Sequence, residues 1–384
     1  MVMRFEKLSN SDHLFLFGAR GTGKTTLIRE LFATKKLLWI DLLRDEDEDL
    51  YGRNPGALSQ AIRAQKPQFV VIDEIQKFPK LLDIIHSEIE GFPKGPFFIL
   101  TGSSARKLKR SQGNLLGGRA RNFHLFPFTA DELGDAFDLG SALEFGTLPL
   151  VFAKEAEKRA DFLRAYVKNY LKEEIVAEQI VRQVEPFRDF LEVAAQMNGE
   201  IINYSRIASD VGVSDQTVKS FFQILEETLV GFLLPPFHRS IRKRQREAPK
   251  FYYFDLGVSR ALARQHTVPL VAGSSSYGKA FEHFIIMEAH RKSEYLRNDF
   301  RLSYLRTKDD AEIDLVIERP GKPDLLIEIK SSTRVKEEDV RALQRFVPDW
   351  DRPCEAVLWS QDPTERLIGA VRCEPWRKGL ERVF

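Results

Sequence analysis

The stretch Gly18-Ala-Arg-Gly-Thr-Gly-Lys-Thr-Thr26 decides the fold of the first part of the chain. It follows an apolar run at residues 14–17 and precedes a helical pattern at residues 27–32, so it lies between a predicted strand and a predicted helix. The glycines let such a loop curl until successive backbone N–H groups point at a phosphate, and the amino end of the helix adds partial positive charge. The stretch therefore predicts a nucleoside triphosphate site.

The polar side chains of this loop have predicted roles. Lys24 is expected to reach the β- and γ-phosphate oxygens of ATP, and the hydroxyl of Thr25 is expected to bind Mg²⁺. The expected cofactors are thus ATP and Mg²⁺. The residues expected to contact the nucleotide are Gly18, Gly21, Thr22, Gly23, Lys24, Thr25 and Thr26.

Short apolar runs recur after the loop, at residues 37–40, 69–72 and 97–100, with helical patterns between them. This alternation predicts an α/β domain with a parallel sheet. The run at 69–72 is followed by Asp73 and Glu74, an arrangement in which one carboxylate holds Mg²⁺ and the next polarises the attacking water. Hydrolysis of ATP is therefore predicted in addition to its binding.

A hydroxyl-rich turn at residues 101–104 follows the last of these runs. If the strands are ordered as in AAA-type ATPases, this turn lies between the phosphate loop and Asp73, and Ser103 is predicted to sense the γ-phosphate. Arg119 follows Gly117, Gly118 and a basic stretch, so it is a candidate for the cation that stabilises charge on the transferred phosphoryl group. A surface arginine explains the same pattern, and both readings stay open.

Length and composition favour a globular protein of several domains. A chain of 384 residues with 43% hydrophobic residues suggests about two or three domains. The only cysteines, Cys354 and Cys373, show neither a disulfide nor a metal-binding pattern. The net charge is +2 and no apolar run reaches about 18 residues, so we expect a cytoplasmic protein without a membrane segment or signal peptide.

The middle of the chain carries a helix-turn-helix pattern. A short helix is predicted before Gly212 and Val213, and Ser214 is expected to cap a second helix whose apolar residues lie at helical spacing up to Leu225. A following strand would complete a winged helix. The predicted DNA-binding residues are Gln216, Thr217 and Lys219 on the second helix and Arg242, Lys243 and Arg244 in the basic run 239–250.

DNA binding is not the only interpretation of this region. Lys219 is the one basic residue predicted on the outer face of the second helix, whereas a helix that enters a groove normally gains affinity from several phosphate contacts. The winged helix can instead serve as a lid or a protein contact. We expect charge reversal in the basic run to decide between these roles.

The C-terminal part resembles a nuclease core. Residues 312–318 and 325–330 read as a strand, a turn and a second strand, with Glu328 and Lys330 on one face. Together with Asp314 on the first strand and Glu282 on the preceding helix, they match the PD-(D/E)xK layout, in which carboxylates hold Mg²⁺ and the lysine orients water. A solvated hairpin of alternating charges is the alternative, and cleavage itself is left open.

The motifs resemble the bacterial and archaeal AAA-type ATPases of the Orc-like and STAND branch, whose C-terminal part is a nuclease-like domain of unknown function (domain of unknown function 4143 type). The shared segments include VVIDEIQ (70–76), LTGSSA (100–105) and GGRA (117–120). The resemblance implies that Pro149 packs on the adenine and that Arg119 acts near the γ-phosphate, either of its own chain or across a subunit boundary in a ring. The glycine pair usual before that proline reads Gly146-Thr147 here.

The fold class expected is α/β, with four parts in sequence. They are a P-loop ATPase core (1–130), a helical lid (131–185), a winged helix (186–248) and an α/β PD-(D/E)xK nuclease-like domain (249–384). Two functions agree with this organisation. One is an ATP-driven motor or remodeller that processes DNA in repair or recombination, and the other is a STAND-like nucleotide-controlled switch in defence, toxin–antitoxin or regulatory signalling.

Overall fold

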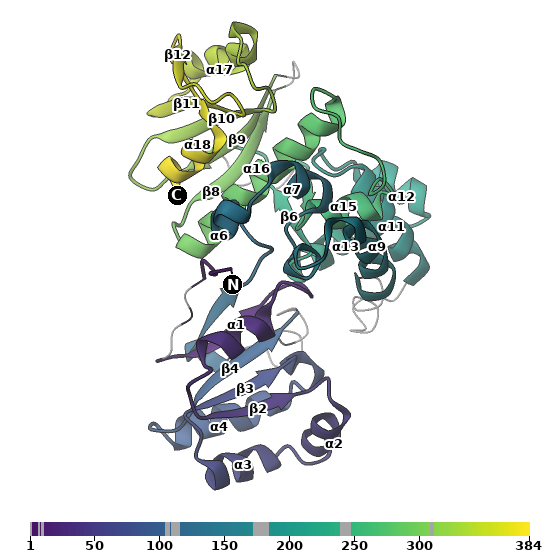
Figure 1. Cartoon of the computed structure of the whole chain (residues 1–384), viewed down its shortest axis with the longest axis vertical. Helices are drawn as coiled ribbons and strands as arrows, with labels where there is room; N and C mark the ends of the chain where they lie inside the picture. Colours follow the sequence, from purple (N-terminus) through teal and green to yellow (C-terminus); the bar gives the residue numbers. More distant parts are fainter. Residues whose placement is uncertain are drawn as a thin grey trace.

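The computed structural model describes residues 2–6, 8, 11–103, 108, 116–171, 184–238, 247–307 and 311–384. Figure 1 shows a sheet domain at one end of the molecule and, at the other end, a helical region beside a second sheet domain. Helix α16 (Ser275–Leu296) lies between these last two parts. No described helix combines the length and the apolar character that a bilayer span requires.

The N-terminal domain is a five-stranded parallel sheet in the order β2-β3-β4-β1-β5. Its strands are β1 (His13–Phe17), β2 (Leu37–Asp41), β3 (Phe69–Asp73), β4 (Phe97–Gly102) and β5 (Ala120–His124). Helix α1 (Lys24–Leu31) covers one face, and α2 (Asp45–Arg53), α3 (Ala57–Gln65) and α4 (Leu81–Gly91) cover the other. The predicted parallel sheet is confirmed, and β4 lies between β1 and β3 as the AAA-type order requires.

The burial of each strand explains whether its sequence shows an apolar run that predicts it. Strand β3 is buried at every position, so its sequence is an unbroken apolar run that ends in Asp73. Strand β5 lies at the edge of the sheet, where Arg121 and Asn122 are exposed and Phe123 is buried. An edge strand with so few buried side chains gives no apolar run, and hydrophobicity alone does not predict it.

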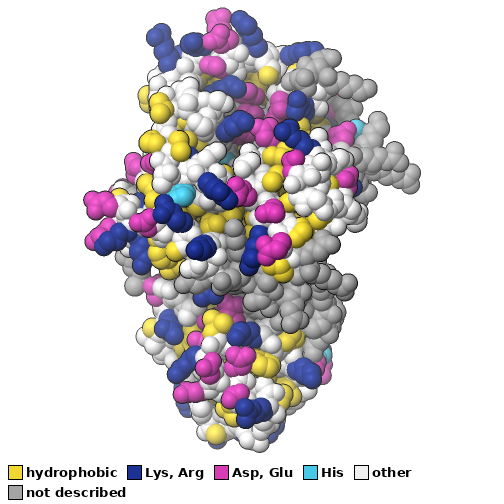
Figure 2. Space-filling view, turned by 90° about the vertical axis from the view of Figure 1, so that its right-hand side faces the viewer, with side chains coloured by type: hydrophobic (Ala, Val, Ile, Leu, Met, Phe, Trp, Pro, Cys, Tyr) yellow, Lys and Arg dark blue, Asp and Glu magenta, His cyan; other side chains and the backbone are white. Residues whose placement is uncertain are grey.

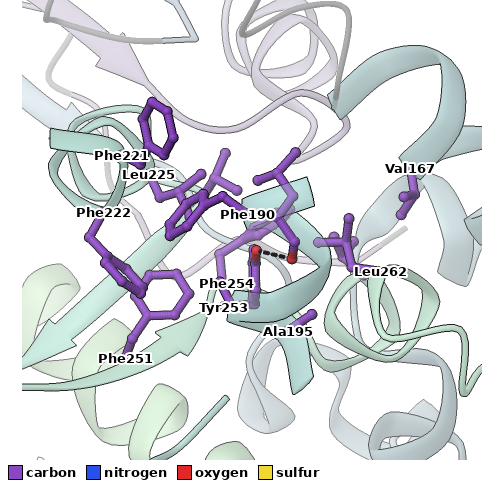
Figure 3. Packing of buried hydrophobic residues seen from close by; sticks show 14 of the residues in the cluster. Val167, Phe190, Ala195, Phe221, Phe222, Leu225, Phe251, Tyr253, Phe254 and Leu262 are labelled. Atoms are coloured by element: carbon purple, nitrogen blue, oxygen red, sulfur yellow. Dashed lines mark hydrogen bonds between the residues drawn. The ribbon is translucent and has the colours of Figure 1, made fainter. Parts of the chain in front are cut away.

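The helical region follows β5, and most of its helices share one aromatic-rich core. Its elements are α6 (Ala130–Leu133), η3 (Gly134–Ala136), α7 (Leu139–Phe145), α8 (Pro149–Phe152), α9 (Ala156–Ala165), η4 (Tyr166–Leu171), α11 (Val184–Gln196), α12 (Tyr204–Val211), α13 (Asp215–Glu227), β6 (Gly231–Leu234), β7 (Lys250–Tyr253) and α15 (Leu256–Leu262). Phe190 on α11 packs edge-on against Phe222 of α13, which in turn meets Phe251 of β7 (Figure 3). The Tyr253 hydroxyl donates to the Leu191 carbonyl at 2.9 Å, which satisfies this buried polar group.

The helix-turn-helix elements predicted from sequence are present. Gly212 ends α12 with φ 70°, in the left-handed region that glycine adopts at low cost. Ser214 caps α13, because its hydroxyl accepts a hydrogen bond from the Thr217 backbone N–H. Strands β6 and β7 pair in antiparallel fashion after α13.

The end of the helical region differs from the predicted division at residue 248. Strand β7 pairs with β6, and Val258 and Leu262 of α15 share a core with helices α9, α11 and α13. The division at 248 therefore falls within the connection between two paired strands. Residues 250–262 pair and pack with the helical region, although Tyr252 and Leu256 also lie in the core around α16. The elements of the second sheet domain begin at α16.

The C-terminal domain is a six-stranded mixed sheet in the order β12-β13-β11-β10-β9-β8. Its elements after α16 are β8 (Arg301–Arg306), β9 (Glu312–Glu318), β10 (Asp324–Lys330), η5 (Glu337–Val340), α17 (Arg341–Phe346), η6 (Val347–Asp349), β11 (Cys354–Ser360), β12 (Arg366–Ile368), β13 (Val371–Pro375) and α18 (Trp376–Val383). Strands β8, β9 and β10 form an antiparallel meander, and β11 is parallel to β10. Helices α16 and α18 pack on one face, and α17 packs on the other.

Helix α16 also joins the domains through buried charges. Glu288 accepts a hydrogen bond from the Ala130 backbone N–H at 2.9 Å. Arg291 donates to the carbonyl oxygens of Phe128 and Phe254, at 3.1 and 2.6 Å, and Lys292 pairs with Asp131. These contacts attach the segment that leaves β5 to the helix that begins the C-terminal domain.

We predict that Glu288 makes folding stability depend on pH. Burial raises the pKa of Glu288 to about 7, although Arg291 lowers it in part. The stability that the protonated carboxyl contributes is present below its ordinary pKa of 4.5 and is lost as the pH rises through about 7. Between about pH 5 and pH 8, the unfolding free energy of the wild type should therefore fall by about 3 kcal/mol more than that of Glu288→Gln, in which the side chain does not ionise. Urea unfolding across this range measures the difference, and parallel profiles would contradict the prediction.

Candidate functional site

The phosphate loop has the backbone that its glycines permit. Gly23 adopts φ 92°, and a Cβ at Gly18 would collide with the Leu125 carbonyl, so both positions require glycine. Lys24 opens α1 and is 6% exposed, and its ammonium donates to the Gly18 carbonyl at 2.7 Å. No carboxylate of the described residues forms an ion pair with Lys24. A buried ammonium without a counter-ion fits a site whose anion comes with the ligand.

Two hydroxyls and one carboxylate meet at the carboxyl ends of β3 and β4. The Thr25 hydroxyl donates to Asp73 Oδ2 at 2.8 Å, and the Thr101 hydroxyl donates to Asp73 Oδ1. The predicted pair of Mg²⁺ ligands, Thr25 and Asp73, is therefore in contact. Among the described residues no group of three or more His, Cys, Asp and Glu side chains can hold a metal ion. This fits Mg²⁺ at a phosphate site, where one or two protein oxygens are joined by waters and phosphate oxygens.

Glu74 and Ser103 are linked by a glutamine that the motif analysis did not single out. Glu74 has φ 59°, a left-handed conformation, and its backbone N–H donates to the Thr101 hydroxyl at 3.2 Å. The Gln76 amide donates to Glu74 Oε2 and to the Ser103 hydroxyl, the latter at 3.1 Å. Gln76 therefore holds the predicted water-polarising carboxylate beside the predicted γ-phosphate sensor. The only feature of the sequence that could have indicated this role is the position of Gln76 two residues after Glu74.

We predict that Gln76 positions Glu74 without binding the nucleotide. Gln76→Leu keeps the side-chain volume but removes both hydrogen bonds, so kcat for ATP should fall about tenfold, the lower end of the effect of losing an orienting partner. KM for ATP should change by less than about twofold, because the two hydrogen bonds that the substitution removes go to Glu74 and Ser103 and not to the phosphate loop. Steady-state phosphate release measures both constants. Gln65→Leu, at an exposed glutamine that ends α3, is the matched control, and an equal loss in both variants would contradict the role.

Pro149 and Arg119 lie at opposite ends of the N-terminal sheet. Pro149 is the first residue of α8, and the neighbouring Leu148 and Leu150 lie against Gly21 of the phosphate loop. Arg119 immediately precedes β5, whose first residue is level with His13 at the amino end of β1. Its guanidinium donates to Glu90 at 2.7 Å. Because β1 runs away from this edge to reach the loop, Arg119 does not reach the phosphate site of its own chain.

The outward face of α13 borders a groove inside the molecule. Gln216 and Lys219 line this groove of about 700 Å³, opposite His124 of β5 and Glu294 of α16. Lys219 also lies 5.2 Å above the ring of Tyr204, and the third predicted residue, Thr217, is half-buried. The predicted contacts Arg242, Lys243 and Arg244 lie outside the described residues.

The structure places the four residues of the predicted nuclease-like layout close to one another. Lys330 donates to Glu328 at 2.6 Å, and Asp314 accepts a hydrogen bond from the Ile329 backbone N–H at 2.8 Å. Burial and the nearby charges of Glu328 and Glu282 raise the pKa of Asp314 well above its usual range. Burial also raises the pKa of Glu328.

Three further residues belong to this cluster and had no predicted role. Lys250 pairs with Glu282 and with Glu312, and the Tyr252 hydroxyl donates to Glu282 at 2.8 Å. Glu312 is two residues before Asp314 on β9, so strand periodicity was a usable signal for it. Lys250 and Tyr252 are remote in sequence from the other members, and no local pattern connects them.

Comparisons with known proteins divide the chain in a similar way. Residues 10–134 match the family model described as "AAA domain", residues 137–268 match "Domain of unknown function (DUF8612)" and residues 277–370 match "Domain of unknown function (DUF4143)". The first match supports an AAA-type ATPase domain in the N-terminal part of the chain. The third match agrees with the domain of unknown function 4143 type that the sequence predicts for the C-terminal part, and it begins within α16.

Related sequences and structures are distant. The uncharacterized protein Rv2008c of Mycobacterium tuberculosis is 24% identical over 82% of this chain and 70% of its own length. The uncharacterized protein MJ1637 of Methanocaldococcus jannaschii is 23% identical over 90% of this chain and 80% of its own. Among solved structures, AMPPCP-bound DnaA from Aquifex aeolicus is 14% identical, covering 56% of this chain and 82% of that one, with a TM-score of 0.28. A structure from work on katanin self-assembly is 15% identical, covering 71% and 77%, with a TM-score of 0.24.

Proposed function

We propose that this protein hydrolyses ATP at the phosphate loop and uses the cycle to move its helical region and C-terminal domain on DNA. The observation that carries the ATPase part is the contact of Thr25 and Thr101 with Asp73, one residue before Glu74. It brings together a metal-binding pair and a second carboxylate at one edge of the sheet. The buried ammonium of Lys24, which forms no ion pair with a carboxylate of the described residues, supports an anionic ligand at the same edge.

Each residue then has a role in the proposed reaction. Lys24 stabilises charge on the β- and γ-phosphate oxygens, and Thr25 and Asp73 hold Mg²⁺, which neutralises phosphate charge when bound. Glu74 accepts a hydrogen bond from the attacking water and takes up its proton, with Gln76 holding the carboxylate in place. We assign Ser103 to contact with the γ-phosphate.

Arg119 completes the proposed site only in an assembly. Since β1 lies between Arg119 and the loop of the same chain, we propose that it acts on the nucleotide of a neighbouring copy. Mass photometry with a non-hydrolysable ATP analogue tests for the assembly. Arg119→Ala should lower turnover at protein concentrations that give the assembly and leave it unchanged for the monomer.

The DNA part of the proposal depends on the connection between β6 and β7. This connection contains the basic run and joins the two strands that follow α13 in the chain, as a wing follows the second helix of a winged helix-turn-helix. The view in Figure 2 instead has lysines and arginines interspersed with carboxylates over the face that it displays. We therefore place the DNA contact on the basic connection and not on a broad surface.

The ATPase rate with single-stranded, duplex and four-way DNA tests this assignment. We expect DNA to stimulate turnover several-fold, and charge reversal at Arg242, Lys243 and Arg244 to remove the stimulation and flatten the salt dependence of DNA binding. Binding and stimulation that survive the charge reversal would refute it. Glu74→Gln is the control that shows that the measured phosphate comes from this site.

A nucleotide-controlled switch is the second candidate, and the position of α13 favours it. The polar face of α13 lines the groove toward β5 and α16, and Leu229, just after the helix, packs on the core of the ATPase sheet. Because α13 lines this groove and Leu229 contacts the ATPase domain, we propose that binding of nucleotide to that domain changes the position of this helix. An ATPase rate indifferent to DNA, with an ATP-dependent change of mass, would favour this function.

A further inference from the structure

The acidic cluster of the C-terminal domain already contains a cation from another part of the chain. Lys250 is 5% exposed, and its ammonium lies 3.1 Å from Glu282 Oε1 and 2.5 Å from Glu312 Oε1. It also lies 5.6 Å above the ring of Tyr304. The two ion pairs place the positive charge of Lys250 inside the cluster.

The backbone fixes this lysine in place. Lys250 pairs with Leu234 in the β6–β7 hairpin and forms a second bridge with Ile201 on its other side. The Tyr252 hydroxyl binds the same Glu282 oxygen as Lys250, and the Tyr304 hydroxyl binds the Ala248 carbonyl at 2.7 Å. The ammonium is thus delivered by a paired strand that two tyrosines attach to the domain.

The remaining oxygens of the cluster do not form a vacant metal site. Lys330 pairs with Glu328 Oε1, and Asp314 Oδ2 accepts a backbone hydrogen bond. Glu328 Oε2 is buried and accepts no hydrogen bond from the part of the chain that the structure describes, so one oxygen of the cluster is left without a donor. The ammonium groups of Lys250 and Lys330 thus occupy carboxylate oxygens on which a divalent cation would depend. With these lysines in place, the cluster does not fit the cation that the nuclease-like layout implies.

We propose that Lys250 is the resident cation of this cluster, and that the docked β6–β7 hairpin keeps the C-terminal domain free of metal. A divalent ion placed among Glu282, Glu312 and Asp314 would lie beside a fixed ammonium, and like charges at such distances repel strongly in a partly buried site. Without the ammonium, these carboxylates and Glu328 Oε2 supply the hard oxygen ligands that Mg²⁺ and Mn²⁺ prefer. Lys250 thus decides between a metal-free and a metal-binding form of the domain.

Binding of Mn²⁺ alone, followed by electron paramagnetic resonance, tests this assignment. The full chain carries Lys24→Ala and Asp73→Asn throughout, which removes the nucleotide site and makes the result independent of the ATPase proposal. We expect no Mn²⁺ bound to this parent, and one Mn²⁺ per chain at least tenfold more tightly after Lys250→Met. Lys279→Met is the matched control, because Lys279 is an exposed lysine of α16 paired with Glu200, and it should behave as the parent.

Further variants keep the result decisive. Adding Asp314→Asn to Lys250→Met should remove the Mn²⁺, and Lys250→Gln, which keeps a polar side chain, should gain it as Lys250→Met does. Folded Lys250→Met and Lys250→Gln proteins that bind no Mn²⁺ would overturn the proposal. If neither variant folds, Mn²⁺ binding to the parent tests the proposal. Mn²⁺ that binds to the parent and is lost on Asp314→Asn would overturn the proposal, and no bound Mn²⁺ is the expected result.

Discussion

Replacing Glu74 with glutamine should lower ATP turnover by about 100- to 1000-fold, the loss typical of removing a general base. The affinity for ATP should change by less than about twofold, since the hydrogen bonds of Glu74 go to Thr101 and Gln76 and not to the phosphate loop. Glutamine also has the size of glutamate and can still accept the hydrogen bond from Gln76. Phosphate release measures the turnover, and isothermal titration calorimetry measures the affinity. The exposed substitution Glu46→Gln on α2 is the matched control.

Comparison with Lys24→Ala separates binding from chemistry. Lys24 lies in the loop itself, so its loss should weaken ATP binding and turnover together, whereas Glu74→Gln should retain bound ATP. Turnover within about tenfold of the wild type for Glu74→Gln would contradict the role of this carboxylate, since loss of a general base costs more. Full affinity and turnover for Lys24→Ala would remove the basis of the whole nucleotide site.

Local motifs predicted the ATPase site because its chemistry is built from consecutive residues. The loop, the Asp73-Glu74 pair and the turn at 101–104 each follow a predicted strand, and parallel strands bring their carboxyl ends to one edge. The order of the strands then placed Ser103 correctly between the other two segments. The pairing of Thr101 with Asp73 was not predicted, because it depends on the register of β4 against β3.

Contacts between domains escaped prediction for a different reason. Helical periodicity identified α13, but it does not tell whether the polar face meets solvent, DNA or another domain. That depends on side chains such as Leu229, which packs on a distant core. Lys250 reads as the end of a basic run, and only the pairing of β7 with β6 carries it into a cluster of carboxylates.

Arg291 is the residue whose loss should most destabilise the junction between domains. It is 3% exposed, and its guanidinium donates to the carbonyl oxygens of Phe128 and Phe254 and to the Thr147 hydroxyl, at 3.1, 2.6 and 3.2 Å. Glu288 lies 3.4 Å away on the preceding turn of α16. Removing the arginine leaves these acceptors buried without a donor and Glu288 without a counter-ion.

Arg291→Met should therefore lower the unfolding free energy by about 3–5 kcal/mol, the usual cost of breaking a buried charge pair. Arg264→Met, at an arginine that is 78% exposed and paired with Glu192, should cost less than about 1 kcal/mol. Urea unfolding measures both. Adding Glu288→Gln to Arg291→Met should restore part of the loss at pH values above about 7, where the carboxyl is ionised in the wild type and loses its counter-ion together with the arginine. If the arginine acts only through its packing, the second substitution will recover nothing, and the electrostatic account of this junction fails.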